Sequence, residues 1–123
     1  MSEAKKILVV EDDLVTQRVL SARLEINGYE VIAARDGEEG LRKARSENPD
    51  LVMLDLMLPK MTGYEVCRML KFDDKYKKIP IIILSSLDQQ DEREKAVQAG
   101  ADAYFIKPFD LELLLVKIKD FIG

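Results

Sequence analysis

The chain has 123 residues, of which 47% are hydrophobic and 34% charged, and its net charge at pH 7 is −4. This composition is typical of a soluble globular protein, and we expect a single domain over residues 1–123. The longest apolar runs are far shorter than the roughly 20 residues that cross a bilayer, which argues against a membrane protein. The Lys and Arg residues are scattered rather than clustered, which argues against nucleic-acid binding by this chain.

Two residue counts set further limits. The chain has no histidine, so the commonest general base and metal ligand is missing, and chemistry must rely on carboxylates, lysine and hydroxyls. Its single cysteine, Cys67, excludes an internal disulfide and fits a reducing compartment. No secretory signal precedes the first apolar run, so we predict a cytoplasmic protein. Cys67 shares a helical face with Val66 and Leu70 and is predicted to lie in the core.

Five short apolar runs alternate with amphipathic segments along the chain. The runs are rich in β-branched residues and nearly continuous in hydrophobicity, which predicts parallel strands covered on both faces. The alternation predicts an α/β fold with a doubly wound parallel sheet. The predicted strands are Lys6–Glu11, Glu30–Ala34, Leu51–Asp55, Ile79–Ser85 and Ala103–Lys107.

The predicted helices have recognisable ends. Asp36 and Thr62 each stand three residues before a glutamate, the pattern of a capping box. Asp88 is predicted to open the fourth helix, Gly100 to close it, and Asp110 to open the fifth.

The first and fifth helices each show an apolar stripe. Asp13 is predicted to cap the first helix and Asn27-Gly28 to end it. In the fifth helix Leu113 and Val116 fall opposite the stripe, which suggests a contact site for a partner. The stripe of the first helix is Val15, Val19, Ala22 and Ile26, and the stripe expected to be buried in the fifth is Leu111, Leu114, Leu115, Ile118 and Ile122.

Polar side chains follow four of the predicted strands. Glu11 and Asp12 come after the first, Asp55 ends the third, Ser85 ends the fourth and Lys107 ends the fifth. The carboxyl ends of parallel strands meet at one edge of a sheet, and this edge carries the ligand site in open α/β folds. Carboxylates gathered there repel one another unless a cation lies among them. The sequence therefore predicts a cation site at this edge.

Five motifs in a fixed order resemble the receiver domain of two-component response regulators. The resemblance covers essentially the whole chain. It implies a flavodoxin-like fold, in which one five-stranded sheet of order 2-1-3-4-5 has five helices distributed over both faces. The motifs are Val9–Asp13, Leu54–Gly63, Ile82–Ser86, Ala99–Tyr104 and Lys107–Phe109.

The resemblance assigns roles to the acidic residues. Asp55 would be the nucleophile that accepts a phosphoryl group from a histidine kinase or a histidine phosphotransfer protein. Glu11 and Asp12, with Asp55 and the backbone carbonyl of Met57, would hold Mg²⁺, or Mn²⁺ in its place. Glu11 stands where aspartate is frequent in the family. The chain is then a regulatory phosphoacceptor rather than an enzyme acting on other substrates.

The remaining motif residues would stabilise and transmit the phosphorylated state. Lys107 would pair with the phosphoryl group, and Ser85 would offer it a hydroxyl. Ser85 and Tyr104 would act as a switch that alters the surface of helix 4, strand 5 and helix 5, where a downstream protein or a second copy binds. The resemblance also implies a cis Lys107-Pro108 bond. Met57 and Leu87 cannot activate water, which predicts slow self-dephosphorylation.

Three other functions are alternatives to this one. A degenerate receiver would bind partners without phosphorylation, although every residue of the active set is present. An aspartate-nucleophile phosphatase of the haloacid-dehalogenase type needs a second aspartate where Met57 stands. A flavin or nucleotide binder needs a glycine-rich loop after the first strand, where this chain is acidic. Whether the chain acts alone or belongs to a longer protein stays open.

Overall fold

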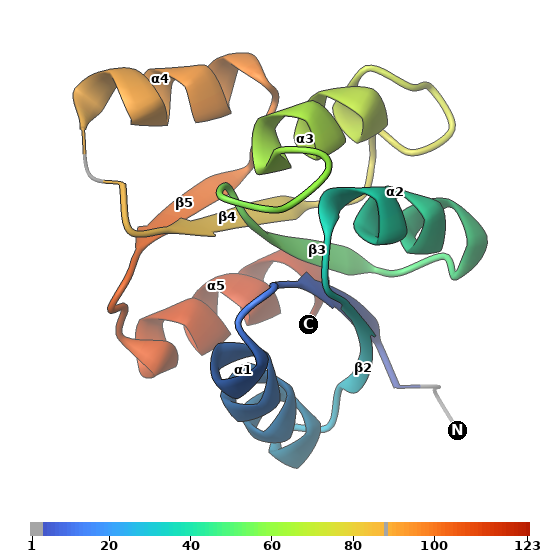
Figure 1. The fold of residues 1–123 in the computed structure, drawn as a ribbon. Coiled ribbons are helices and arrows are strands. Elements are labelled where there is room, and N and C mark those ends of the chain that lie inside the picture. The colour runs from blue at the N-terminus through green and yellow to red at the C-terminus, as the bar shows by residue number, and fades with distance from the viewer. Residues whose placement is uncertain (1–3, 88) are drawn as a thin grey trace.

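The computed structural model describes residues 4–87 and 89–123 as a five-stranded parallel sheet between two layers of helices (Figure 1). The strand order is β2-β1-β3-β4-β5, as predicted. None of the helices in the described residues is long and apolar enough to span a membrane. The strands are β1 (Lys6–Val10), β2 (Glu30–Ala34), β3 (Leu51–Asp55), β4 (Ile81–Ser85) and β5 (Ala103–Ile106).

Three strands are slightly shorter than predicted. Strands β1 and β5 end one residue earlier, so Glu11 and Lys107 lie just beyond the sheet. Strand β4 begins two residues later, because Pro80 has no N–H to donate to a neighbouring strand. The sheet therefore presents Glu11 and Lys107 at the start of the loops that follow β1 and β5.

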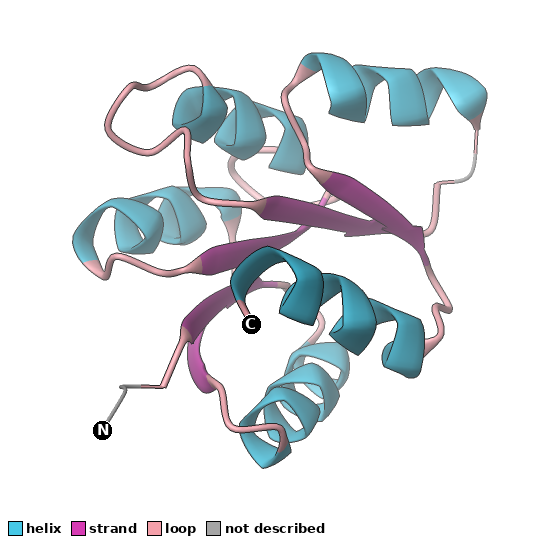
Figure 2. Cartoon of the chain, turned by 180° about the vertical axis from the view of Figure 1, so that it is seen from behind, coloured by secondary structure: helices cyan, strands magenta, loops and turns pink. Residues whose placement is uncertain are grey.

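The helices cover both faces of the sheet, with α1 and α5 on one side and α2, α3 and α4 on the other, as Figures 1 and 2 show from opposite directions. The stripe predicted on α5 packs against the sheet, while Leu113 and Val116 are exposed, as expected. The helices are α1 (Leu14–Ile26), α2 (Gly37–Ser46), α3 (Gly63–Lys71), α4 (Gln90–Gln98) and α5 (Leu111–Ile122).

Three of the predicted helix caps are confirmed. The Asp13 carboxylate accepts a hydrogen bond from the N–H of Thr16, and that of Asp110 accepts from the N–H groups of Glu112 and Leu113. Thr62 forms the full capping box at the start of α3. These bonds satisfy amide groups that the first turn of a helix leaves without a backbone acceptor.

Two cap predictions have a different outcome. Asp36 caps α2 through the N–H of Glu39, but the Glu39 carboxylate accepts from the N–H of Arg35 instead of closing a box with Asp36. Helix α4 begins after Gln89, whose side chain makes no capping hydrogen bond. Asp88, the predicted opening residue, lies outside the described residues.

The stripe read from α1 is not the face that this helix buries. Val15, Val19, Ala22 and Ile26 are all exposed, with Ile26 at 79%. Gln17, Leu20 and Leu24 lie against the sheet instead. Both sets repeat at helical spacing, so periodicity alone could not choose between them, and the two leucines bury more apolar area than the valines.

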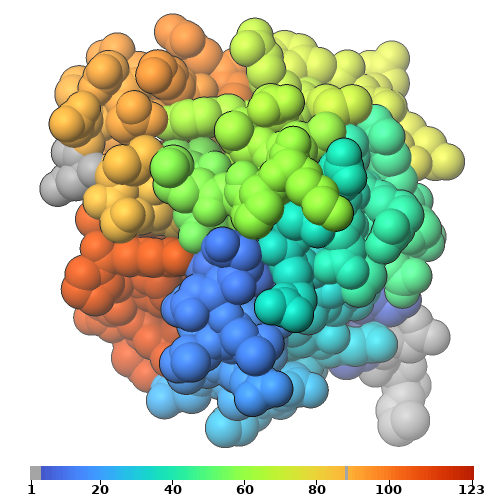
Figure 3. Space-filling model, in the orientation of Figure 1, coloured from blue at the N-terminus to red at the C-terminus, as the bar shows by residue number. Residues whose placement is uncertain are grey.

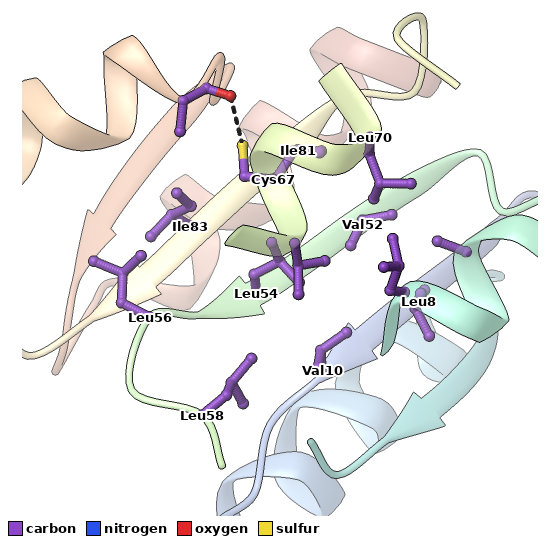
Figure 4. Close-up of a cluster of buried hydrophobic side chains, with 14 of the residues drawn as sticks. Leu8, Val10, Val52, Leu54, Leu56, Leu58, Cys67, Leu70, Ile81 and Ile83 are labelled. Atoms are coloured by element: carbon purple, nitrogen blue, oxygen red, sulfur yellow. Dashed lines mark hydrogen bonds between the residues drawn. The ribbon is translucent and has the colours of Figure 1, made fainter. Parts of the chain in front are cut away.

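The core is divided by the sheet into two clusters. Figure 4 shows the cluster under α2, α3 and α4, in which side chains of β1, β3 and β4 meet the inner faces of the helices. Cys67 belongs to this cluster, as predicted, and its thiol donates to the carbonyl of Ala99 at 3.4 Å. Burial raises the pKa of Cys67 to about 12, so its reactive thiolate form is strongly disfavoured.

Candidate functional site

The carboxyl ends of four strands meet at one edge of the sheet. The parallel register pairs Val10 with Leu54, Asp55 with Leu84, and Ser85 with Ile106, so the residues at and after these positions come together. Figure 3 shows this face, on which the start of α1 (blue), the segment after β3 (green) and the segment after β5 (orange-red) meet.

Three carboxylates gather at this edge. One carboxylate oxygen from each of Glu11, Asp12 and Asp55 lies within 4.8 Å of the other two. Glu11 is buried, Asp55 is half-buried and Asp12 is exposed, so the cluster runs from the protein interior to solvent. Like charges this close raise the free energy of the folded state unless cations offset them.

Lys107 lies between two of these carboxylates. Its Nζ donates to Glu11 Oε1 at 2.5 Å and to Asp55 Oδ2 at 3.1 Å. Burial alone would lower the pKa of Lys107, but its bonds to Glu11 and Asp55 outweigh burial and raise it. Burial raises the pKa of Glu11, against the hydrogen bonds from Lys107 and from the Asp13 N–H. One ammonium is thus bonded to two of the three carboxylates, which leaves negative charge for a second cation.

Backbone groups hold the end of β3 in place. The N–H of Met57 donates to Asp55 Oδ1 at 3.1 Å, so one Asp55 oxygen faces the backbone and the other faces Lys107. Gly63, the first residue of α3, packs directly on this turn, and a Cβ there would lie 2.4 Å from the Asp55 carbonyl oxygen. A glycine is therefore required where α3 begins, because any side chain would displace the strand end that carries Asp55.

Ser85 and Tyr104 are joined through Leu87. The Ser85 side chain is fully buried, and its Oγ accepts from the N–H of Leu87 at 3.0 Å. The Tyr104 hydroxyl donates to the carbonyl of Leu87 at 2.6 Å, and the Arg93 guanidinium lies over the Tyr104 ring. Both polar backbone groups of Leu87 are thus bonded to the two residues that the sequence predicts as a switch.

The donor set at this edge fits a small divalent cation. Mg²⁺ and Mn²⁺ prefer oxygen ligands, and Mg²⁺ keeps several waters, so a site open to solvent on the Asp12 side suits it. Each of the three carboxylates supplies oxygen ligands, and Lys107 is bonded to one oxygen of Glu11 and one of Asp55. The predicted participation of the Met57 carbonyl stays a prediction.

The structure brings Glu11, Asp12, Asp55, Ser85 and Lys107 to the same edge, while Tyr104 lies within β5 and reaches that edge only through its bond to Leu87. Two further residues were missed by sequence reasoning. Leu87 was singled out only for its side chain, although its backbone makes the connection. Gln17 is buried beside β1 and β2. Its polar side chain at helical spacing from Leu20 and Leu24 was the available signal, but the valine stripe of α1 concealed it.

Comparison with known proteins gives the family. Residues 7–119 match the model of the response regulator receiver domain. The chain is 43% identical over 115 residues to the alkaline phosphatase synthesis transcriptional regulatory protein PhoP of Bacillus subtilis, covering 94% of this chain and 47% of PhoP. It is 34% identical over 119 residues to the polar-differentiation response regulator DivK of Brucella anthropi, covering 97% of both chains. The chain spans about half the length of the first curated relatives that it matches.

A solved structure with the same fold holds a magnesium ion. It is the receiver domain of a sensor histidine kinase from Pseudomonas aeruginosa, described with a magnesium ion coordinated in its active-site cleft. The two chains are 34% identical, with a TM-score of 0.89 and 98% of each covered. The family match, the strand order and the acidic cluster agree, and the chain belongs to the response regulator receiver domain family of two-component systems.

Proposed function

We propose that this receiver domain accepts a phosphoryl group on Asp55 from a phosphohistidine of a sensor kinase or a histidine phosphotransfer protein. The observation that carries the proposal is the cluster of Glu11, Asp12 and Asp55 oxygens within 4.8 Å, with Lys107 bonded to two of the three. Phosphoryl transfer depends mainly on positioning and on neutralising charge, and this arrangement supplies both.

Glu11, Asp12 and Asp55 are the residues that would hold Mg²⁺ or Mn²⁺, together with the backbone carbonyl of Met57. The bound ion would neutralise negative charge on the phosphoryl oxygens during transfer. These carboxylates already lie close together, so binding of the ion needs little rearrangement of the backbone.

Asp55 acts as the nucleophile in this proposal. One of its carboxylate oxygens attacks the phosphorus, the P–N bond of the phosphohistidine breaks, and the imidazole nitrogen leaves with the electron pair. Lys107, 3.1 Å from Asp55 Oδ2, follows the charge onto the phosphoryl group as a point cation. The Ser85 hydroxyl, which now accepts from Leu87, would donate its own proton to a phosphoryl oxygen.

The switch follows from the bonds to Leu87. When Ser85 turns toward the phosphoryl group, the N–H of Leu87 loses its acceptor, and the segment between β4 and α4 moves. Tyr104 holds the carbonyl of the same residue, so its side chain repositions with the segment. The phosphoryl group biases two conformations by bonding to Ser85 in only one of them.

The output surface in this proposal is that of α4, β5 and α5. Leu113 and Val116 are 60% and 56% exposed on α5, and they would contact a downstream protein or a second copy of the chain. The domain would act as a regulator that assists only its own phosphorylation and dephosphorylation. The proposal places this chemistry in the cytoplasm, a reducing compartment that suits the single thiol of the chain.

Labelling with a small phosphodonor tests the proposal. The protein is incubated with acetyl phosphate and Mg²⁺, and intact mass is measured for the parent and for the Asp55→Asn variant. We expect the parent to gain one phosphoryl group and the variant none. Ser86→Ala, an exposed hydroxyl next to the site, is the matched control and should label like the parent. Equal labelling of the parent and Asp55→Asn would contradict the proposal.

Association through α5 is tested separately. Leu113→Ser and Val116→Ser replace exposed side chains, so the fold should change in stability by no more than about 0.5 kcal/mol. We expect both variants to become phosphorylated normally and to lose phosphorylation-dependent association, measured by light scattering or partner binding. If association is unchanged in both variants, α5 does not provide the contact.

A further inference from the structure

Gln17 is a buried polar residue that the proposed chemistry does not use. Three polar or charged side chains are buried among the described residues, namely Glu11, Ser85 and Gln17. The first two belong to the site already described. Burying an amide in a protein core is unfavourable unless its hydrogen bonds are made, and Leu20 and Leu24 show that aliphatic side chains fill the same face of α1.

The Gln17 amide bridges the ends of two strands. Its Nε2 donates to the carbonyl of Ala34, at the end of β2, at 2.9 Å and to the carbonyl of Glu11, just after β1, at 3.3 Å. Both partners are carbonyl oxygens, which only accept, so the nitrogen of the amide must face them.

These bonds close a ring around Glu11. The N–H of Glu11 donates to the same Ala34 carbonyl at 3.0 Å, so one acceptor receives both the backbone of Glu11 and the side chain of Gln17. The carbonyl of Glu11 is held from the other side by Gln17. Both backbone polar groups of Glu11 are therefore fixed, and with them the direction in which the next residue leaves the strand.

That next residue is Asp12, which depends on its backbone for its position. Its carboxylate is exposed and makes no hydrogen bond or ion pair within residues 4–87 and 89–123. Glu11, by contrast, is also held through its side chain, by Lys107 and by the N–H of Asp13. If the Gln17 bonds are lost, Asp12 is therefore freer to move out of the cluster than Glu11 is.

We infer that Gln17 is a positioning residue for the metal site, and that its amide preorganises the Glu11–Asp12 pair for a divalent cation. The inference rests on the proposed role of this pair as ligands. Residues that orient metal ligands without touching the metal contribute on the order of tenfold to a hundredfold in affinity. Gln17 would orient the carboxylates of both Glu11 and Asp12, because its amide fixes the backbone that carries them.

Magnesium affinity of the intact chain tests the inference. Isothermal titration calorimetry with MgCl₂ is carried out on the parent, on Gln17→Met and on Leu24→Ala. Methionine has a similar length and no donor, while Leu24 lies two turns further along the same buried face and makes no bond to the site. We expect Gln17→Met to bind Mg²⁺ on the order of tenfold more weakly than the parent, and Leu24→Ala to bind like the parent.

A spectroscopic measurement accompanies the titration. The amide nitrogen of Asp12 is bonded to the carbonyl carbon of Glu11, so its chemical shift should change when the Gln17 bond to that carbonyl is lost. If Gln17→Met does not fold, Gln17→Asn keeps the amide on a side chain one methylene shorter and should show a smaller loss of affinity in the same direction.

The outcomes separate this inference from the proposed function. If the parent binds Mg²⁺ and Gln17→Met binds it equally well, Gln17 does not position the site. If Leu24→Ala weakens binding as much as Gln17→Met, loss of stability explains the effect and the inference is wrong. If the parent does not bind Mg²⁺ at all, the proposed metal role of Glu11 and Asp12 fails first.

Discussion

At the scale of single residues, the position and charge of Lys107 are set by the two carboxylates that it contacts. The Lys107–Phe109 motif predicts a site role for this lysine, and in the folded chain its Nζ lies between Glu11 and Asp55. The bonds to these carboxylates raise its pKa despite burial, so it is charged at neutral pH. A lysine fixed in this way balances part of the charge of the cluster, and in the proposed reaction it would follow the charge onto the phosphoryl group.

Met57 should limit the loss of the phosphoryl group. Its side chain is 65% exposed, and the N–H of Met57 is fixed to Asp55, so the residue stands at the entrance to the site. A thioether cannot orient water, whereas an amide can. We expect Met57→Asn to speed self-dephosphorylation by roughly tenfold, less than a full general base contributes.

The decay of the acyl phosphate after removal of the phosphodonor measures this rate. Met69→Asn, a change of the same kind at a partly exposed position on α3, serves as the control and should leave the decay unchanged. A Met57→Asn variant that decays no faster than the parent would show that another feature sets the lifetime.

At the scale of elements, α1 shows that helical spacing alone does not identify the buried face of a helix. Leu24 is fully buried and Val19 is 57% exposed, although both belong to helical stripes. We expect Leu24→Ala to lower the free energy of unfolding by about 2–5 kcal/mol, because it leaves a cavity under the sheet. Val19→Ala should change it by less than about 0.5 kcal/mol.

Urea unfolding of the two variants beside the parent makes the comparison. The result also checks which face of α1 meets the sheet, since the sequence stripe of Val15, Val19 and Ile26 predicts the opposite ranking. A larger loss for Val19→Ala than for Leu24→Ala would mean that the observed rotation of the helix is wrong.

Helix α2 should respond to acid through its cap. The hydrogen bond from the Glu39 N–H, with Lys60 and Arg42 nearby, lowers the pKa of Asp36 below its ordinary value of 3.8. A depressed carboxyl pKa contributes stability above the ordinary value, and this contribution is lost as pH falls through the folded-state pKa. Asparagine is a good cap that does not titrate.

The melting temperatures of the parent and of Asp36→Asn, measured from neutral pH down to about pH 3, test this sign. We expect the parent to be the more stable at neutral pH, where the charged cap also favours the helix N-terminus, and its advantage to shrink as pH falls. A difference between the two proteins that does not change with pH would show that the Asp36 charge has no part in capping.

At the scale of the whole molecule, the parallel sheet explains how much could be predicted from the sequence. Glu11, Asp55, Ser85 and Lys107 are predictable because each lies at or just after the end of an apolar run, and parallel strands bring such ends to one edge. The strand order, which the resemblance to receiver domains implies, is also confirmed.

The parts that could not be predicted depend on tertiary contacts. The buried face of α1 is decided by contact with the sheet. The Gln17 side chain bonds to the carbonyl of Ala34, which lies 17 positions further along the chain. The bonds from Ser85 and Tyr104 meet on the backbone of Leu87, whose polar groups carry no sequence signal. Periodicity identifies the elements, but their relative rotation and these backbone acceptors appear only in the folded chain.

The carboxylates at the sheet edge are expected to form a site for a divalent cation. An ion that binds the folded state alone stabilises it by about 1.4 kcal/mol when present at about ten times its Kd. For a domain of this size that corresponds to a rise in Tm of roughly 5 °C. The carboxylates also repel one another less once the ion is bound.

Thermal unfolding of the parent and of Asp12→Asn, with millimolar MgCl₂ or with NaCl at matched ionic strength, is the most direct test of this claim. We predict that MgCl₂ raises the Tm of the parent above its value in NaCl, and that Asp12→Asn loses most of this rise because one of three carboxylate ligands is gone. A parent Tm that is the same in both salts would contradict the assignment of Glu11, Asp12 and Asp55 as a cation site.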